Sequence, residues 1–269
     1  MLVTRHELNR DGRDFVVGDI HGTYSIVAAA LNAVRFDWSL DRLFSVGDLV
    51  DRGPESRRAL PFIRNPRIFP IMGNHESMFL ECYEDGIPDE DVLRFWTSRN
   101  GMSWWMDLDH DERMALIDAF RTLPLAMEIE TLRGTVGLVH AEVPHGMTWQ
   151  AFKIALELGD KHVTKTALWG RERISHGDDA GVRGIDRVFC GHTIVDRPYR
   201  AGNVYYIDSG SFVGVHSDDA TEGRLTMADL LSCTQTFKSL PTGEFFDIRG
   251  DAVTDRPFGN YASYNAHQA

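Results

Sequence analysis

Short apolar runs that end in a polar, metal-capable side chain recur along this chain, and no other feature restricts its fold as much. Residues 15–17 run into Gly18-Asp19, residues 43–46 into Gly47-Asp48, residues 68–72 into Gly73-Asn74, and residues 188–190 into Gly191-His192. Residues 136–139 run directly into His140, and residues 204–207 into Asp208-Ser209-Gly210. Short β-branched runs bounded by glycine are typical of buried strands. The sequence therefore predicts a set of buried strands with polar side chains at their ends.

Segments with helical spacing separate these runs, at residues 23–35, 55–64, 89–105 and 111–123. In the first segment, Tyr24, Val27, Leu31 and Val34 recur on one face of a helix. Pro54 suits the first position of the second helix. Strands that alternate with helices indicate an α/β protein. Such folds bind ligands at the carboxyl ends of their strands, where the polar side chains of this chain lie.

The length of 269 residues fits one large domain or two small ones. We predict a single domain over residues 1–240. Within it, residues 77–123 hold Trp96, Trp104 and Trp105. They form either a helical cap beside the site or, as we favour, a helical layer packed on the sheet. Residues 241–269 are rich in Gly, Asp, Pro and Asn, and we predict a partly disordered C-terminal extension.

Charge and cysteine content exclude several classes of protein. The chain has 28 Lys and Arg against 40 Asp and Glu, a net charge of -12. This sign disfavours binding to nucleic acid and to acidic membrane surfaces. The three cysteines are too few and too widely spaced for a disulfide framework, which favours a reducing compartment. Neither a signal peptide nor an apolar run of ~20 residues occurs, so we predict a cytoplasmic protein.

The polar side chains at the predicted strand ends share one donor chemistry. They offer carboxylate, imidazole and amide donors and no thiolate, and the set comprises Asp19, His21, Asp48, Asn74, His140 and His192. Such donors suit Mn, Fe or Zn held open for reaction, and not a closed structural zinc site. Six ligands are too many for one ion that must also bind substrate. A two-metal site is the simpler interpretation, and two-metal sites hydrolyse phosphate esters by in-line displacement.

The motifs GDIHG (18–22), GDLVDRGPES (47–56), GNHESM (73–78), LVHAE (138–142), WGRERIS (169–175), CGHT (190–193) and YIDSGS (206–211) occur in this order. With them the chain resembles the metal-dependent phosphoprotein phosphatases of the calcineurin-like phosphoesterase superfamily, and among these the bacterial and phage lambda-type serine/threonine phosphatases. The resemblance implies a β-sandwich of two mixed sheets flanked by helices. It also implies that the site binds two divalent ions, for which Mn²⁺ is the preferred assignment and Fe or Zn are the alternatives.

The resemblance further implies a role for each site residue. Asp19 and His21 would hold the first ion, Asp48 would bridge both, and Asn74, His140 and His192 would complete the second. A hydroxide between the ions would be the nucleophile. His75 would be the general acid, oriented by Asp51. Arg52, Arg171 and Asn74 would contact the phosphate of the substrate.

Three functions remain open at the level of the sequence. The first is a phosphatase acting on phosphoserine or phosphothreonine, and also phosphotyrosine, in a phosphoprotein or phosphopeptide. The second is a symmetrical dinucleoside tetraphosphate hydrolase or a small-molecule phosphatase; the nucleotide hydrolases commonly lack the aspartate at position 51. The third is a non-catalytic scaffold stabilised by metal. Met72 replaces the arginine that often precedes GNHE in this family, which bears on substrate preference. The sequence does not indicate an oligomeric state.

Overall fold

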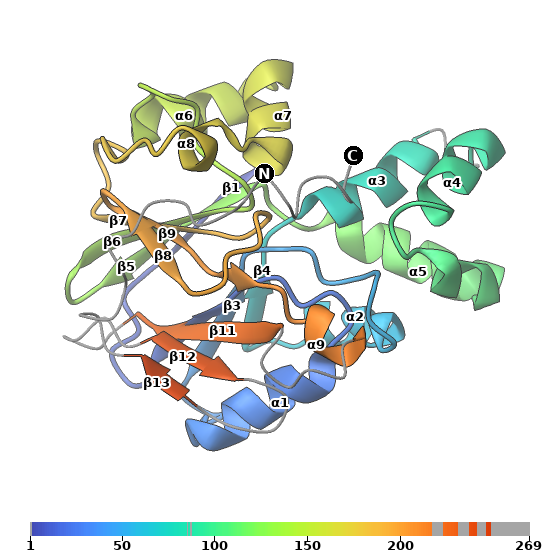
Figure 1. The fold of residues 1–269 in the computed structure, drawn as a ribbon, viewed down its shortest axis with the longest axis horizontal. Helices are drawn as coiled ribbons and strands as arrows, with labels where there is room; N and C mark the ends of the chain where they lie inside the picture. Colours follow the sequence, from blue (N-terminus) through green and yellow to red (C-terminus); the bar gives the residue numbers. More distant parts are fainter. Residues whose placement is uncertain are drawn as a thin grey trace.

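Two mixed β-sheets pack face to face in the computed structural model of this chain (Figure 1). It describes residues 2–84, 86, 88–216 and 223–230, together with the strands 237–240 and 246–248. The first sheet has the order β1 (Val3–His6), β5 (Ala126–Thr131), β6 (Gly134–Val139), β7 (Arg187–Cys190), β9 (Val204–Tyr206) and β8 (Tyr199–Ala201). Strands β6, β7 and β9 run parallel, with Gly137 opposite Val188 and Phe189 opposite Tyr205.

The second sheet has the order β13 (Phe246–Ile248), β12 (Phe237–Leu240), β11 (Arg224–Asp229), β2 (Asp14–Val17), β3 (Arg42–Ser45) and β4 (Ile68–Pro70), with β10 (Asp208–Ser209) paired to β11. Strands β2, β3 and β4 are parallel, and Val16 lies opposite Phe44. Each sheet therefore contains three adjacent parallel strands, whose carboxyl ends form a common edge.

The alternation of side chains along each strand separates two hydrophobic cores, because successive residues of a strand point to opposite faces. Val16 and Phe44 pack between the sheets against Leu138 and Phe189 of the opposite sheet. Their neighbours Val17 and Leu43, together with Val139 and Val188, belong to the outer core. Strands β2, β7 and β9 are buried along their whole length, which explains their continuous apolar runs in the sequence.

Helices cover the outer faces of the sandwich. In Figure 1, α6 (Trp149–Glu157), α7 (Lys161–Trp169) and α8 (Glu172–Ser175) lie over the first sheet, and α1 (Tyr24–Ala33) lies under the second. The short helices η1 (Ser56–Arg58), α2 (Ala59–Ile63) and α9 (Val213–His216) lie beside α1. No helix in the described part of the chain has the length and apolar character needed to cross a bilayer.

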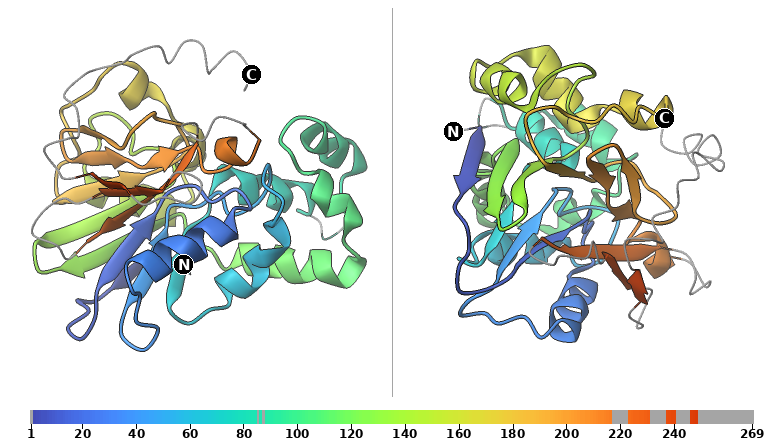
Figure 2. Two further views of the ribbon diagram at one scale, coloured as in Figure 1. Left: turned by 60° about the horizontal axis from the view of Figure 1, so that its bottom comes forward. Right: turned by 90° about the vertical axis from the view of Figure 1, so that its left-hand side faces the viewer.

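The remaining helices extend from one end of the sandwich. They are α3 (Asn74–Cys82), α4 (Glu90–Thr97), η2 (Ser103–Asp107) and α5 (His110–Arg121). The left view of Figure 2 shows them beside the sheets, and in the right view they lie behind the sheets; α3 contacts both α4 and α5. Phe79, Trp105 and Phe120 form their buried aromatic centre, with ring centroids of Phe79 and Trp105 4.3 Å apart.

The α/β sandwich of two mixed sheets flanked by helices confirms the fold class predicted from the sequence. The predicted helix over residues 89–105 is wrong in extent, because α4 ends at Thr97 and Gly101 then adopts a φ of +73°. Strand β13 lies in the region assigned to the C-terminal extension and pairs with β12. The rest of that extension, residues 241–245 and 249–269, lies outside the described residues.

Candidate metal centre and active site

The carboxyl ends of the parallel strands bring the predicted ligands to one edge of the sandwich. Asp19 and His21 follow β2, Asp48 follows β3, and Asn74 begins the helix after β4. From the other sheet, His140 follows β6 and His192 follows β7. Hydrogen bonds join the loops: Asp48 O accepts from His21 N at 2.8 Å, and His140 O accepts from Gly191 N at 2.8 Å. All six side chains are buried.

Asp48 lies at the centre of this arrangement. Its Oδ2 is 3.4 Å from His21 Nε2, and its Oδ1 is 3.4 Å from His140 Nε2. Asp48 belongs to two groups of candidate donor atoms, and within each group the atoms lie within 4.8 Å of one another. The first group comprises His21, Asp48 and His75, and the second comprises Asp48, His140 and His192. A carboxylate shared in this way can bridge two ions. Asp19 belongs to neither group at this distance; its Oδ2 accepts a hydrogen bond from His192 N at 3.0 Å.

Backbone carbonyls set the tautomers of two histidines. His21 Nδ1 lies 2.9 Å from Val50 O and His140 Nδ1 lies 2.8 Å from Val46 O, so in each ring Nδ1–H donates and Nε2 keeps its lone pair. This is the usual way in which a protein orients metal-binding imidazoles. His140 Nε2 and Asn74 Oδ1 are then two acceptors only 2.8 Å apart. A cation beside both atoms relieves this contact, as would the opposite orientation of the Asn74 amide.

Other features of the site also fit a cation. Asp19 Oδ1 and His192 Nε2 are buried and without a hydrogen-bond partner among the described residues. Burial, followed by the charges of Asp208 and Asp48, raises the pKa of Asp19 well above its usual value. Burial lowers the pKa of His21 and of His192 well below the usual value, which favours the neutral imidazole, the form that binds metal. The donor set present therefore fits divalent ions of the Mn, Fe or Zn type.

His75 and Asp51 form a buried pair beside this centre. His75 Nδ1 lies 2.6 Å from Asp51 Oδ2, and His75 Nε2 lies 3.9 Å from Asp48 Oδ2. Burial raises the pKa of Asp51, while hydrogen bonds from His75 and Trp104 act in the opposite direction. The structure thus directs one ring nitrogen of His75 to Asp51 and the other to the candidate metal centre, an arrangement suited to proton transfer.

The two arginines predicted to hold phosphate lie at the rim of the site. Arg52 Nη1 is 3.1 Å from His21 Nε2, and its guanidinium lies 4.8 Å from the centre of the Phe212 ring. Arg171 donates through Nη1 to Thr193 Oγ1 at 3.3 Å, next to His192. Arg52 and Arg171, both partly buried, therefore bring two cations to the side of the candidate ligands.

Sequence reasoning missed three residues that shape the site. Glu76 is fully buried and accepts hydrogen bonds from Asp48 N, Leu49 N and Gly73 N, so it ties the loop after β3 to the start of α3. Asp208 is buried, and burial raises its pKa to about 6. Trp104 donates to Asp51 Oδ1 at 2.7 Å. Glu76 and Asp208 lie inside the motifs quoted above, which was an available signal. Trp104 was noted only as part of a possible cap over residues 77–123, and no motif includes it.

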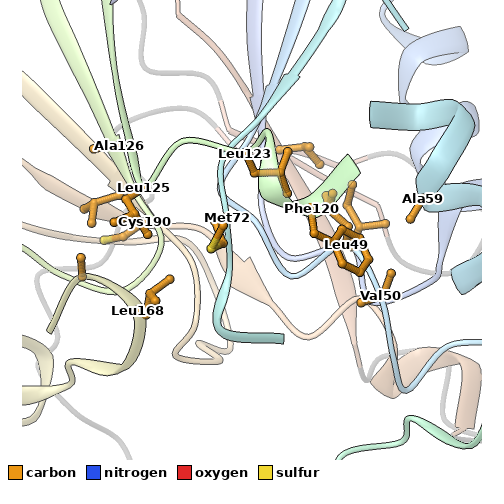
Figure 3. Close-up of a cluster of buried hydrophobic side chains, with 14 of the residues drawn as sticks. Leu49, Val50, Ala59, Met72, Phe120, Leu123, Leu125, Ala126, Leu168 and Cys190 are labelled. Carbon is orange, nitrogen blue, oxygen red and sulfur yellow. The ribbon is translucent and has the colours of Figure 1, made fainter. Parts of the chain in front are cut away.

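Met72, which stands where an arginine was expected, belongs to the hydrophobic core. Its side chain is 9% exposed, and its N donates to Pro124 O at 2.8 Å. Figure 3 shows it between Leu125 and Cys190 on one side and Leu49 and Phe120 on the other. An arginine would bury a charge in these surroundings, so the apolar residue fits the local packing.

Comparisons with known proteins agree with this geometry. The sequence profile described as calcineurin-like phosphoesterase matches residues 15–196. The chain is 35% identical over 217 residues to serine/threonine-protein phosphatase 1 of Salmonella typhimurium, covering 80% of this chain and 90% of the relative. It is 31% identical over 170 residues to a symmetrical bis(5'-nucleosyl)-tetraphosphatase of Methylococcus capsulatus, covering 61% of this chain and 55% of the relative.

A solved structure described as a putative diadenosine tetraphosphatase has a TM-score of 0.59 to this fold at 22% identity, covering 92% of this chain and 97% of the other. It supports the fold alone. The family profile covers well over half of the chain and includes the strand ends from Asp19 to His192. Together with the two mixed sheets and the clustered donors, these matches show that the chain belongs to the calcineurin-like phosphoesterase family.

Proposed function

We propose that this chain is a metal-dependent phosphomonoesterase that acts on phosphoserine and phosphothreonine in proteins or peptides, with phosphotyrosine as a further substrate. The observation that carries the proposal is the buried His75–Asp51 pair, with Nδ1 and Oδ2 2.6 Å apart, beside the shared carboxylate of Asp48. An alkoxide is a poor leaving group, so a positioned acid accelerates its departure by ~10²–10⁴-fold.

Asp19, His21 and Asp48 would hold one divalent ion, and Asp48, Asn74, His140 and His192 a second. When bound, such ions acidify the attacking water and neutralise charge on the phosphoryl group. We favour Mn²⁺, as the resemblance to the family implies; the carboxylate, imidazole and amide donors suit Fe and Zn as well.

The side chains of the protein itself perform the remaining tasks. His75 would carry a proton on Nε2 and deliver it to the leaving oxygen, while Nδ1–H stays bonded to Asp51 Oδ2. Asp51 stabilises the imidazolium and fixes the ring. Arg52 and Arg171 would bind the phosphoryl oxygens, for which planar guanidinium groups are well suited. Asn74 lies beside the same space and would contact both the ion and the phosphate.

Symmetrical hydrolysis of dinucleoside tetraphosphates is the second candidate function. It is supported by the identity to the Methylococcus tetraphosphatase. In that reaction the leaving group is a nucleoside diphosphate, which is stable as an anion and gains little from an acid. The His75–Asp51 pair is therefore better matched to an alkoxide leaving group.

The buried, free thiols of Cys82 and Cys190 agree with a reducing compartment, and we propose that the protein acts in the cytoplasm.

Parallel rate measurements test the proposal. With Mn²⁺ supplied, kcat/KM is measured on a phosphoserine peptide, diadenosine tetraphosphate and a free nucleotide, for the wild type and for His75→Asn. We expect the phosphopeptide to be the best substrate and His75→Asn to lower its rate by ~10²–10⁴-fold. A faster reaction with diadenosine tetraphosphate would favour the second function. Full activity in excess chelator would exclude the metal-dependent mechanism.

A further inference from the structure

The segment after α4 folds back onto the turn that carries Asp51 and Arg52. Trp104, in η2, donates its indole N–H to Asp51 Oδ1 at 2.7 Å. The other oxygen of the same carboxylate, Oδ2, bonds to His75 Nδ1 at 2.6 Å. Each oxygen of Asp51 thus has its own donor, and the two donors come from different helical elements. Asp51 itself is fully buried, so water does not replace either donor.

A second contact joins the same two segments. Arg52 N donates to Gly101 O at 3.2 Å, and a Cβ atom added to Gly101 would lie 2.8 Å from Arg52 N. The backbones therefore approach as closely as a glycine permits. Asp51 and Arg52 both have positive φ, +73° and +67°, a strained conformation that persists only where its surroundings hold it. Residues 101–104 supply part of those surroundings.

We propose that Trp104 is a positioning residue of the general acid, whose indole N–H holds Asp51 so that its second oxygen fixes His75 for proton delivery to the leaving group. Residues 98–107, which lie outside the sandwich, thereby complete the general-acid site formed by His75 and Asp51. This inference rests on the proposed role of His75. A carboxylate without the Trp104 donor would be free to rotate, and His75 would lose a fixed orientation.

The substitution Trp104→Phe removes the donor and keeps an aromatic ring beside Phe79 and Trp105. A hydrogen bond to a charged group contributes ~1.5–3 kcal/mol, so a decrease in kcat of ~10–100-fold is expected where the acid limits the rate. With 2,4-dinitrophenyl phosphate, whose leaving group needs no proton, we expect nearly unchanged kcat. With phenyl phosphate and a phosphoserine peptide we expect the full decrease, with KM little altered.

Trp149→Phe is the matched control. The Trp149 indole also donates to a carboxylate, Glu128 Oε2 at 2.9 Å, but on α6 over the first sheet. Loss of that bond affects stability and leaves the ratio of the two aryl phosphate rates unchanged. If Trp104→Phe fails to fold, benzothienylalanine at position 104 provides the same test, since it keeps the shape of the indole and lacks the N–H.

The variant His75→Asn separates the two levels of the proposal. If His75→Asn slows phenyl phosphate far more than dinitrophenyl phosphate and Trp104→Phe does the same to a smaller degree, the inference is supported. If only His75→Asn shows this dependence on the leaving group, Trp104 has no positioning role. If neither shows it, the acid role of His75 is wrong, and the inference falls with it. An equal decrease on all substrates in Trp104→Phe would indicate a structural effect alone.

Discussion

The substitution Gly191→Ala provides a direct test of the role of Asp19, because it leaves every candidate ligand unchanged. A Cβ atom added to Gly191 would lie 1.8 Å from Asp19 Oδ1, the buried oxygen that has no partner in the described structure. The backbone of Gly191 does not have a positive φ, so Gly191→Ala introduces a steric conflict and no backbone strain. Asp19 must then move.

The size of that movement determines the expected effect. Ordinary contact begins at 3.4 Å, so Oδ1 must retreat by about 1.6 Å. Metal–oxygen distances tolerate changes of only ~0.2 Å, so Asp19 would no longer bind an ion in its original position. Changes next to a ligand typically lower metal affinity by ~10–100-fold. For Gly191→Ala we expect the upper part of this range, since the ligand atom itself is displaced.

The assay is the Mn²⁺ concentration that gives half-maximal phosphatase activity, checked by direct titration of the metal-free protein. The control is Gly137→Ala, in which the new Cβ would lie 2.6 Å from Trp149 Cη2, away from the site. Gly137→Ala should lower stability and leave the Mn²⁺ requirement unchanged. An unaltered Mn²⁺ requirement in Gly191→Ala would refute the assignment of Asp19 as a ligand.

Two further predictions concern Arg52 and His6. Arg52→Lys keeps the charge and loses the planar pair of donors, so kcat/KM should fall by ~10–100-fold for substrates with good and with poor leaving groups alike. A decrease confined to substrates with poor leaving groups would contradict a role of Arg52 in phosphate binding. Burial, and then the charge of Arg42, lowers the pKa of His6 from 6.5. Below that pH the unfolded chain binds a proton that the folded chain does not, so the free energy of unfolding falls as the pH falls through 6.5, and it should fall less in His6→Gln. The difference in Tm between the two proteins, measured from about pH 5 to pH 8, checks this, and a constant difference would contradict it.

The sequence predicted the strand ends well because two signals coincide there. A buried strand needs an apolar run, and the sharp turn after it needs glycine, as at Gly47 with a φ of +97°. Strands β2, β3, β4, β6 and β7 therefore coincide with predicted runs, and the candidate ligands that follow them converge. Helices α6 and α7 were not predicted, although Thr148 and Asp160 cap their N-termini through hydrogen bonds to the following backbone N–H groups. Those capping residues were a usable signal.

The contacts of residues 98–104 could not be predicted from local pattern. We predicted one helix over residues 89–105, although residues 98–101 (Ser-Arg-Asn-Gly) interrupt the apolar spacing. The approach of Gly101 to Arg52, almost fifty positions away, is a tertiary contact that no local pattern indicates. Pro54 was placed in the first turn of a helix, and this was wrong, since η1 begins at Ser56. Tertiary contacts with His21 and Gly22, not local propensity, shape residues 51–55.

Backbone strain at the site leads to a last prediction, on stability. Six non-glycine residues in the described structure have positive φ, and five of them are site residues: His21, Asp48, Asp51, Arg52 and His192. Each such conformation costs ~1–3 kcal/mol, and their sum is comparable to the whole stability of an ordinary domain. Burial of the site carboxylates, and then their mutual repulsion, adds to this cost, as the raised pKa of Asp19 shows. We therefore expect bound metal to supply much of the compensation.

Metal that binds only the folded chain stabilises it by about 2.7 kcal/mol at a hundred times its Kd. Mn²⁺ should accordingly raise Tm by several degrees, and chelator should reverse the shift. Gly191→Ala should need a higher Mn²⁺ concentration for the same shift, because the displaced Asp19 weakens binding. His75→Asn should retain most of the shift, since Asp48, His140 and His192 remain to bind metal. A Tm that does not respond to Mn²⁺ in the wild type would mean that the packing of Glu76 and Ser211 against these loops sustains the strain by itself.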